Sequence, residues 1–177
     1  MNIFILNAGR CGSTTFIKAC QHIQNFTALH ESRSVFTGTQ RLEYPDNHIE
    51  ADNRLSWFLG RLDQKYGNNA FYVHLTRNHE SMTESFARRK DYGIMKAYKE
   101  GILQGGTELQ TAHDLALDYI ETVEANIMLF LKDKTNKMTF RLESAKDDLA
   151  VFWNAIGAEG NLVSALAEWD VHYNASV

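Results

Sequence analysis

Proline and cysteine are both rare in this 177-residue sequence. The only proline is Pro45, and the two cysteines are Cys11 and Cys20. A disulfide framework needs more thiols than this, and two thiols alone do not make a zinc site. The seven histidines lack the spacing of metal-ligand motifs such as HExxH, so we expect no bound metal.

The sequence also lacks an excess of positive charge, since its formal net charge is -4. Broad nucleic-acid binding needs a basic surface, so we expect no nucleic-acid partner. No apolar run approaches the roughly 18–20 residues that span a bilayer, and the first residues do not resemble a secretory signal. We therefore expect a cytoplasmic protein with no membrane span, folded as one domain over residues 1–177.

Short β-like runs alternate with helical patterns along the chain, which is typical of the α/β class. Apolar runs predict strands over residues 3–7, 26–30, 71–75 and 137–142. The helical spacing of apolar residues predicts helices over 15–22, 52–66, 78–90, 94–103, 114–133 and about 144–157. Residues 33–50 are polar and are predicted to be irregular. The expected fold is a three-layer α/β/α arrangement around a mainly parallel sheet of four to five strands, similar to that of the P-loop NTPases.

Three segments have the residue patterns of helix N-termini. Asn78 is predicted to cap the helix that follows the third strand. Thr111 to Asp114 and Ser144 to Asp147 each fit a capping box, in which two residues exchange hydrogen bonds with each other's backbone N–H groups. Cys20 is predicted to pack in the core as part of the first helix.

The first predicted strand runs into a loop with the residue types of an anion site, Gly9-Arg10-Cys11-Gly12-Ser13-Thr14-Thr15. Glycines allow a tight turn with inward-pointing N–H groups, and the following helix adds free N–H groups and the positive end of its dipole. The hydroxyls are further donors, and Arg10 adds a planar charged group suited to oxyanions. An NTPase P-loop would have Lys after its final Gly, where this sequence has Ser13. The loop therefore predicts binding of a phosphorylated nucleotide, but not an ordinary ATP or GTP hydrolase.

A second polar cluster follows the strand predicted over 71–75. Arg77 lies at the carboxyl end of this strand, and Ser85 lies about two turns into the next helix. Both could reach a second anion held beside the start of that helix, and residues 88–90 extend the positive charge. Taken alone, an Arg at a strand end is more often an ion-pair partner.

Together the two clusters resemble the sulfotransferases that use 3′-phosphoadenosine 5′-phosphosulfate (PAPS). In that family the first loop has Lys or Arg, any residue, Gly, and then two Ser or Thr residues, which Arg10-Cys11-Gly12-Ser13-Thr14 matches. The family also has an Arg followed eight residues later by a Ser, as are Arg77 and Ser85. A weaker similarity is Phe140-Arg141-Leu142-Glu143, so the resemblance covers about residues 3–157.

The resemblance implies an enzyme that transfers a sulfuryl group from PAPS to a hydroxyl or amine and releases 3′,5′-adenosine bisphosphate, without a metal. It implies that the 5′-phosphosulfate lies on the first loop and that Arg77 and Ser85 hold the 3′-phosphate. The implied donor-binding residues are Arg10, Cys11, Gly12, Ser13, Thr14, Thr15, Arg77 and Ser85. Arg10 would stabilise charge on the leaving phosphate. Glu31 is the implied general base, with His30 as the alternative.

Two other functions remain open at this point. A P-loop-type nucleotide or small-molecule kinase would need a phosphate lysine and a magnesium-holding Asp at a strand end, and neither is evident. A non-catalytic nucleotide-binding module could keep the same loops. The acceptor is an unidentified small molecule or carbohydrate. Arg33, Arg41 and Arg54 could meet an acidic acceptor, but solvated surface charges are the commoner case. The long helix and the aromatic tail could serve a homodimer or the core.

Overall fold

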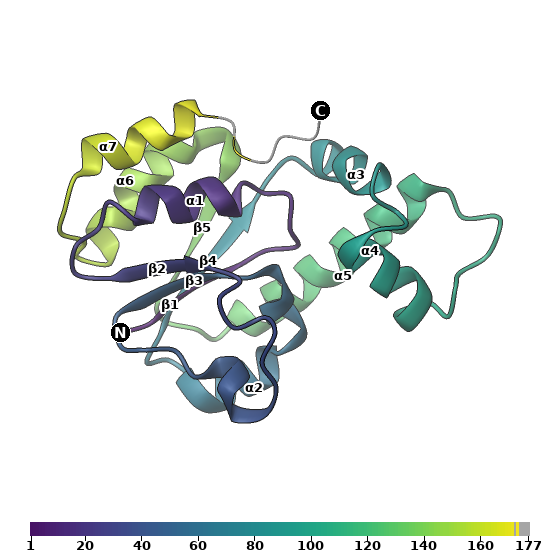
Figure 1. Ribbon diagram of the computed structural model, residues 1–177, viewed down its shortest axis with the longest axis horizontal. Helices are drawn as coiled ribbons and strands as arrows, with labels where there is room; N and C mark the ends of the chain where they lie inside the picture. The colour runs from purple at the N-terminus through teal and green to yellow at the C-terminus, as the bar shows by residue number, and fades with distance from the viewer. Residues whose placement is uncertain (172, 174–177) are drawn as a thin grey trace.

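The computed structural model describes residues 1–171 and 173, and its centre is a five-stranded sheet in which every pair of neighbouring strands is parallel (Figure 1). The strand order is β2-β3-β1-β4-β5. The strands are β1 (Ile3–Leu6), β2 (Thr27–His30), β3 (His48–Ala51), β4 (Phe71–Thr76) and β5 (Lys137–Arg141). The predicted α/β class and the mainly parallel sheet are confirmed.

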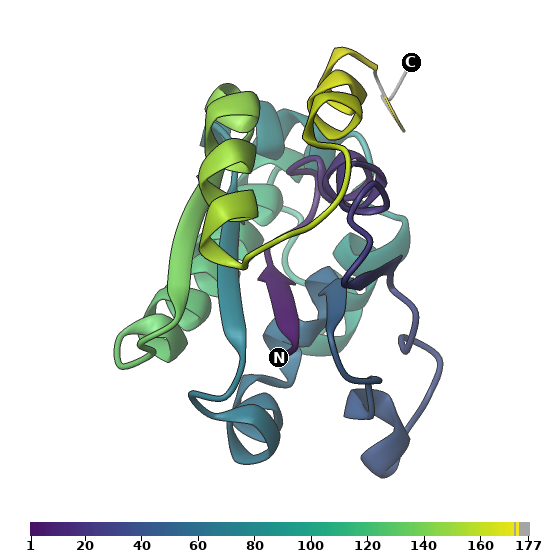
Figure 2. The same cartoon turned by 90° about the vertical axis from the view of Figure 1, so that its left-hand side faces the viewer.

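Helices cover both faces of this sheet and complete three layers (Figures 1 and 2). The α-helices are α1 (Ser13–Cys20), α2 (Leu59–Tyr66), α3 (His79–Ala87), α4 (Gly93–Ala97), α5 (Ala112–Leu131), α6 (Ala145–Ala155) and α7 (Leu162–Ala167). Shorter helical turns are η1 (Gly38–Leu42), η2 (Asn53–Trp57), the π-helical η3 (Tyr98–Ile102), η4 (Leu142–Ser144) and η5 (Glu168–Asp170). In Figure 1, α1, α6 and α7 lie on one face and α2 and α5 on the other, while α3 and α4 extend beyond the carboxyl ends of the strands. No helix in the described ranges is long and apolar enough to cross a bilayer.

The central strand β1 is buried along its whole length and sets the position of the loop that follows it. Its residues pair with β3 on one side and with β4 on the other. A strand buried on both faces is expected to be continuously apolar, as Ile3-Phe4-Ile5-Leu6 is. The loop over residues 9–15 therefore follows a strand that is fully buried and paired on both sides.

The prediction that residues 33–50 are irregular is wrong at its end, because His48–Ala51 form β3 between β1 and β2. The sequence did not indicate a strand here because His48 and Glu50 are polar, yet both are buried. Burial of these groups is compatible with stability only when they are hydrogen-bonded. Their partners come from β2 and from the turn after it, so the local pattern does not reveal them.

The predicted helix ends have mixed outcomes. Asn78 Oδ1 accepts a hydrogen bond from the Ser81 N–H at 3.1 Å, and the capping box at Thr111 is present. The second capping box is wrong, because Ser144 makes no side-chain capping bond. Its hydroxyl instead donates to Asp148 Oδ2 at 3.1 Å, because residues 142–144 form a 3₁₀ turn that changes how the chain enters α6.

The expectation of solvated arginines is wrong for Arg41. Its side chain is 2% exposed, and its Nη2 lies 2.6 Å from Oδ2 of Asp52, which is completely buried. A buried guanidinium needs such a partner, because removing an ion from water carries a large penalty. Arg54 is half-buried and pairs with Glu31, whereas Arg33 lies over the ring of Phe36.

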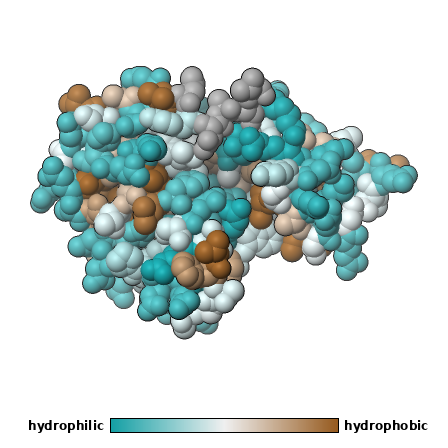
Figure 3. Space-filling model, viewed as in Figure 1, coloured by the Kyte–Doolittle hydropathy of each residue, from teal (hydrophilic) through white to brown (hydrophobic). Residues whose placement is uncertain are grey.

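The face of the molecule in Figure 3 is mostly hydrophilic, with apolar side chains in small separate groups.

Candidate active site

The loop after β1 turns sharply because several of its residues have positive φ angles. These are Gly9 (103°), Arg10 (60°) and Gly12 (84°). Gly12 is also the N-cap residue of α1, and its carbonyl accepts the Phe16 N–H at 2.9 Å. A Cβ atom on Gly12 would lie 2.8 Å from Leu142 Cδ1, so the loop packs closely against the chain after β5. Successive N–H groups in a turn of this kind can form a concavity that binds anions.

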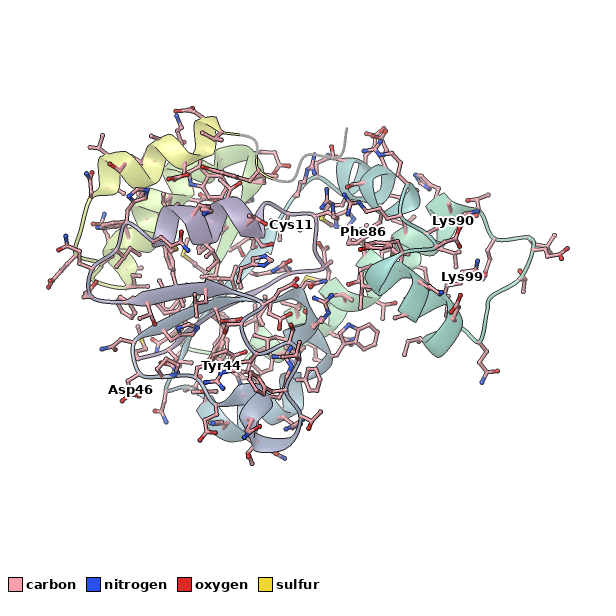
Figure 4. All side chains as sticks on the ribbon, in the orientation of Figure 1. Cys11, Tyr44, Asp46, Phe86, Lys90 and Lys99 are labelled. Carbon is pink, nitrogen blue, oxygen red and sulfur yellow. The ribbon has the colours of Figure 1, made fainter. Side chains whose placement is uncertain are left out.

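Cys11 fixes the underside of this loop to the core. Its side chain is completely buried, and its Sγ lies 3.0 Å from the Gly9 carbonyl oxygen and 3.1 Å from Met82 Sδ. Figure 4 shows Cys11 in the loop before α1. Burial raises the pKa of its thiol to about 12. Cys11 can therefore contact a ligand in this loop only through its main chain, and Cys20 is buried as predicted.

The two polar clusters found in the sequence meet in space. Arg10 Nε donates to Ser85 Oγ at 2.9 Å, and Arg77 Nη1 donates to the main-chain oxygen of Arg10 at 3.2 Å. They meet because β1 and β4 are neighbours and their carboxyl ends lie side by side. Burial first, and then the charges of Arg89 and Arg77, lower the pKa of the Arg10 guanidinium. Positive charge is thus concentrated where the two strands end.

A cleft of about 710 Å³ opens above this meeting point. Its floor and one side contain the predicted donor-binding residues Arg10, Gly12, Ser13, Thr14, Thr15, Arg77 and Ser85. Further charged and polar positions are Ser81, Glu84 and Arg88. The opposite wall was not predicted and comprises residues 142–147 together with Trp169, Val171 and Tyr173. The sequence marked residues 140–143 only as a weak family similarity and residues 144–147 only as a helix start, and the wall forms where the chain after β5 meets the chain after α7.

Trp169 is the most distinctive residue of the unpredicted wall. Its ring packs on Phe140 and Phe16, with centroid separations of 5.4 and 6.4 Å. Its indole N–H is buried and has no hydrogen-bond partner within the part of the chain that the structure describes. Buried donors are normally paired, so this N–H is a candidate contact for a ligand in the first cleft.

A second cleft, of about 480 Å³, lies on the other side of the same loop. It shares Arg10, Ser13 and Thr14 with the first cleft, and it also contains His30 and Glu31. The remaining lining residues are Gly9, Asn53, Arg54, Phe86, Arg89, Tyr92, Gly93, Ile94 and Met95. Figure 4 shows Phe86 at the end of α3, near α4.

His30 and Glu31 reach this second cleft even though β2 is not a neighbour of β1. His30 ends β2 and Glu31 follows it, and β3 separates β2 from β1 within the same sheet. His30 Nε2 nevertheless lies 2.9 Å from Ser13 Oγ. Glu31 Oε2 lies 2.9 Å from Arg54 Nη1. Both candidate bases therefore line the second cleft, and His30 contacts Ser13, which lines both clefts.

The arrangement is suited to moving an anionic group between two bound molecules. One loop carries a guanidinium, main-chain N–H groups and hydroxyls, and it borders both clefts. In the described residues, no group of three or more His, Cys, Asp or Glu side chains is placed to hold a metal ion. The guanidinium, main-chain N–H groups and hydroxyls of the loop are donors that can meet charge developing during such a transfer.

Comparison with known proteins agrees with this architecture. The sequence matches no protein-family model, and it matches no curated protein sequence at a significant level. The structure is similar to that of a sulfotransferase domain from the curacin biosynthetic pathway, with a TM-score of 0.67 and 15% sequence identity. The similarity covers 93% of this chain and 75% of that domain. The chain thus shares the fold of a sulfotransferase domain.

Proposed function

We propose that this protein is a sulfotransferase that moves a sulfuryl group from PAPS to a hydroxyl or amine of a small acceptor. The observation that carries the proposal is the contact of Arg10 with both Ser85 and Arg77 at a loop between two clefts. PAPS has two separate anionic ends, and a donor in the first cleft needs one cationic site for each. The sequence motifs and the shared fold support the same assignment.

The donor is assigned to the first cleft. The 5′-phosphosulfate lies on residues 10–15, where it accepts hydrogen bonds from the main-chain N–H groups and from the hydroxyls of Ser13, Thr14 and Thr15. Arg77 and Ser85 hold the 3′-phosphate. Trp169 lines the same cleft and is a candidate neighbour of the nucleotide base. A volume of about 710 Å³ lies within the range of clefts that hold ligands of this size.

The acceptor is assigned to the second cleft. Its lining combines the apolar side chains of Phe86, Ile94 and Met95 with the positively charged side chains of Arg54 and Arg89. This lining favours a small acceptor with an apolar portion and a polar or acidic group. Since Arg10 lines both clefts, an acceptor in the second cleft would lie next to the loop that holds the sulfuryl group. In-line transfer requires its oxygen or nitrogen to approach from the side opposite the leaving phosphate.

Transfer requires three linked events. The acceptor oxygen or nitrogen forms a bond to sulfur, the bond from sulfur to the phosphate oxygen breaks, and the electron pair of that bond stays on the phosphate. Arg10 stabilises the charge that develops there. The acceptor proton goes to Glu31, or alternatively to His30. Loss of a general base typically lowers turnover by 10²–10⁴-fold.

The base assignment is tested by comparing Glu31→Gln with His30→Ala. We expect Glu31→Gln to lower turnover of PAPS with an accepted substrate by about 10²–10⁴-fold while the affinity for 3′,5′-adenosine bisphosphate stays within about twofold. If Glu31→Gln keeps near-full turnover and His30→Ala abolishes it, His30 is the base.

The nucleotide assignment is tested by thermal denaturation with 3′,5′-adenosine bisphosphate and with ATP·Mg²⁺. A ligand at 100 times its dissociation constant stabilises the folded state by about 2.7 kcal/mol. For a chain of this length, that free energy raises the melting temperature by about 5–11 °C. We expect this shift for 3′,5′-adenosine bisphosphate and a much smaller one for ATP·Mg²⁺. A larger shift with ATP·Mg²⁺ would favour the kinase alternative, and binding without any sulfuryl transfer would favour a non-catalytic module.

A further inference from the structure

The turn that carries Glu31 has an unfavourable backbone conformation. Glu31 directly follows β2 and has a φ angle of 52°, in the left-handed region that residues other than Gly adopt infrequently. Its N–H donates to the Ala51 carbonyl at 3.0 Å, and its own carbonyl accepts the Ser34 N–H at 3.2 Å. Such strain persists only where the surrounding structure holds the residue in place, and it is frequent at functional sites.

A buried carboxylate lies directly beneath this turn. Glu50, in the middle of β3, is completely buried. Its Oε1 accepts the Ser32 N–H at 2.7 Å, and its Oε2 accepts the Ser32 hydroxyl at 2.6 Å. His48 Nε2 lies 2.9 Å from Oε2, and His48 Nδ1 lies 2.8 Å from Thr27 Oγ1. The carboxylate thus binds both hydrogen-bond donors of the residue that follows Glu31.

The ion pair between Glu31 and Arg54 is too exposed to fix the turn by itself. The two side chains are 35% and 39% exposed, and exposed ion pairs contribute little to the free energy of folding. The Glu50 side chain, in contrast, is completely buried, and an unpaired polar group is more costly there. The contacts of Glu50 with Ser32, together with the main-chain bond from Glu31 to Ala51, therefore hold the turn more firmly than the ion pair does.

Burying a carboxylate in the middle of a sheet carries a large desolvation penalty, and an apolar residue at the same place is often at least as stable. The presence of Glu50 in β3 calls for a role other than stability. We propose that Glu50 is a positioning residue, which holds the turn at Glu31 and Ser32 so that the Glu31 carboxylate faces the acceptor. This role rests on the proposed sulfotransferase function, in which Glu31 is the base.

A double-mutant cycle tests whether Glu50 acts through Glu31. The four proteins are wild type, Glu50→Gln, Glu31→Gln and the double variant. The measurement is release of 3′,5′-adenosine bisphosphate from saturating PAPS, with water as the acceptor and sulfate as the second product. We expect Glu50→Gln to lower the rate at least tenfold in the wild-type background and less than twofold in the Glu31→Gln background. An equal loss in both backgrounds would mean that Glu50 is merely structural, and would overturn the proposal.

Amide hydrogen exchange tests the same proposal without any turnover. In Glu50→Gln, the Ser32 N–H is expected to exchange at least tenfold faster relative to the Leu29 N–H of β2, which corrects for any loss of global stability. Ser32→Ala, which removes only the hydroxyl contact and is less disruptive, is expected to give a smaller change in the same direction at the Glu31 N–H. Unchanged exchange of the Ser32 N–H in Glu50→Gln would overturn the proposal.

Tyr44→Phe is the matched control. Tyr44 is buried in the same region and stacks on His48 with a centroid separation of 5.3 Å, but it makes no contact with the turn among the described hydrogen bonds. Figure 4 shows Tyr44 below the strands, near α2. This variant is expected to leave the relative exchange of Ser32 unchanged. If wild type binds no 3′,5′-adenosine bisphosphate, the sulfotransferase proposal fails, and the exchange measurement still reports separately whether Glu50 holds the turn.

Discussion

Replacing Arg77 with Ala separates the two ends of the proposed donor. The Arg77 side chain is half-buried, lines the first cleft and donates to the Arg10 carbonyl at 3.2 Å. A hydrogen bond to a charged group contributes about 1.5–3 kcal/mol. Since about 1.4 kcal/mol corresponds to a tenfold change in affinity, loss of the contact with the 3′-phosphate should weaken binding about 10–150-fold.

Isothermal titration calorimetry at constant ionic strength measures this difference. The ligands are 3′,5′-adenosine bisphosphate and 5′-AMP, which lacks the 3′-phosphate. Arg77→Ala also removes the bond to the Arg10 carbonyl, which supports the loop without touching the ligand, so we expect a much smaller loss for 5′-AMP. Arg141→Ala is the control for net charge, because Arg141 is exposed at the end of the neighbouring strand β5 and does not line the first cleft.

Equal losses for the two ligands would refute this reasoning, because they would mean that Arg77 acts on the loop and not on the 3′-phosphate. An equal effect of Arg141→Ala would also refute it. In that case the loss would reflect the general field of the protein, which salt screens, and not a direct contact.

Three further predictions concern the structure around the site. Arg41→Met should lower the free energy of unfolding by about 3–5 kcal/mol, because it leaves the buried Asp52 carboxylate without its ion-pair partner. A loss below about 1 kcal/mol, measured by urea denaturation, would contradict this prediction. Gly12→Ala should weaken binding of 3′,5′-adenosine bisphosphate, because the φ angle of Gly12 is 84° and the new Cβ would lie 2.8 Å from Leu142 Cδ1. Gly60→Ala is the control, because its Cβ would meet no atom within 4 Å and should have no effect on binding. The free energy of unfolding should fall as pH rises above about 9, because burial raises the pKa of the folded Cys11 thiol to about 12 and the unfolded thiol therefore ionises first. Cys11→Ala should show a shallower fall of this free energy between pH 8 and 10. An identical dependence on pH in the variant would contradict the prediction.

The sequence predicted the parts of the fold whose signals are local. The apolar run of β1 and the Gly-rich loop after it both indicate their structures directly. By contrast, β3 and the buried side chain of Arg41 were missed. In each case a polar side chain is buried because a partner from another part of the chain satisfies its hydrogen bonds, and periodicity contains no information about that partner.

The candidate site was predictable to the same extent. Arg10, Arg77 and Ser85 follow strand ends, and the carboxyl ends of neighbouring parallel strands meet, so their proximity could be expected. The division into two clefts could not be expected, because the walls contributed by Trp169 and by Met95 depend on how distant helices pack. Glu50 was missed because its importance becomes apparent only from the turn that it supports.

The sharing of Arg10, Ser13 and Thr14 by both clefts has a thermodynamic consequence. A ligand in one cleft that changes the charge balance or the position of these residues must change the affinity of the other cleft. By linkage, the second ligand then changes the affinity for the first by the same factor. For the proposed donor and acceptor, we therefore expect cooperative binding whose size and sign depend on a loop of only a few residues.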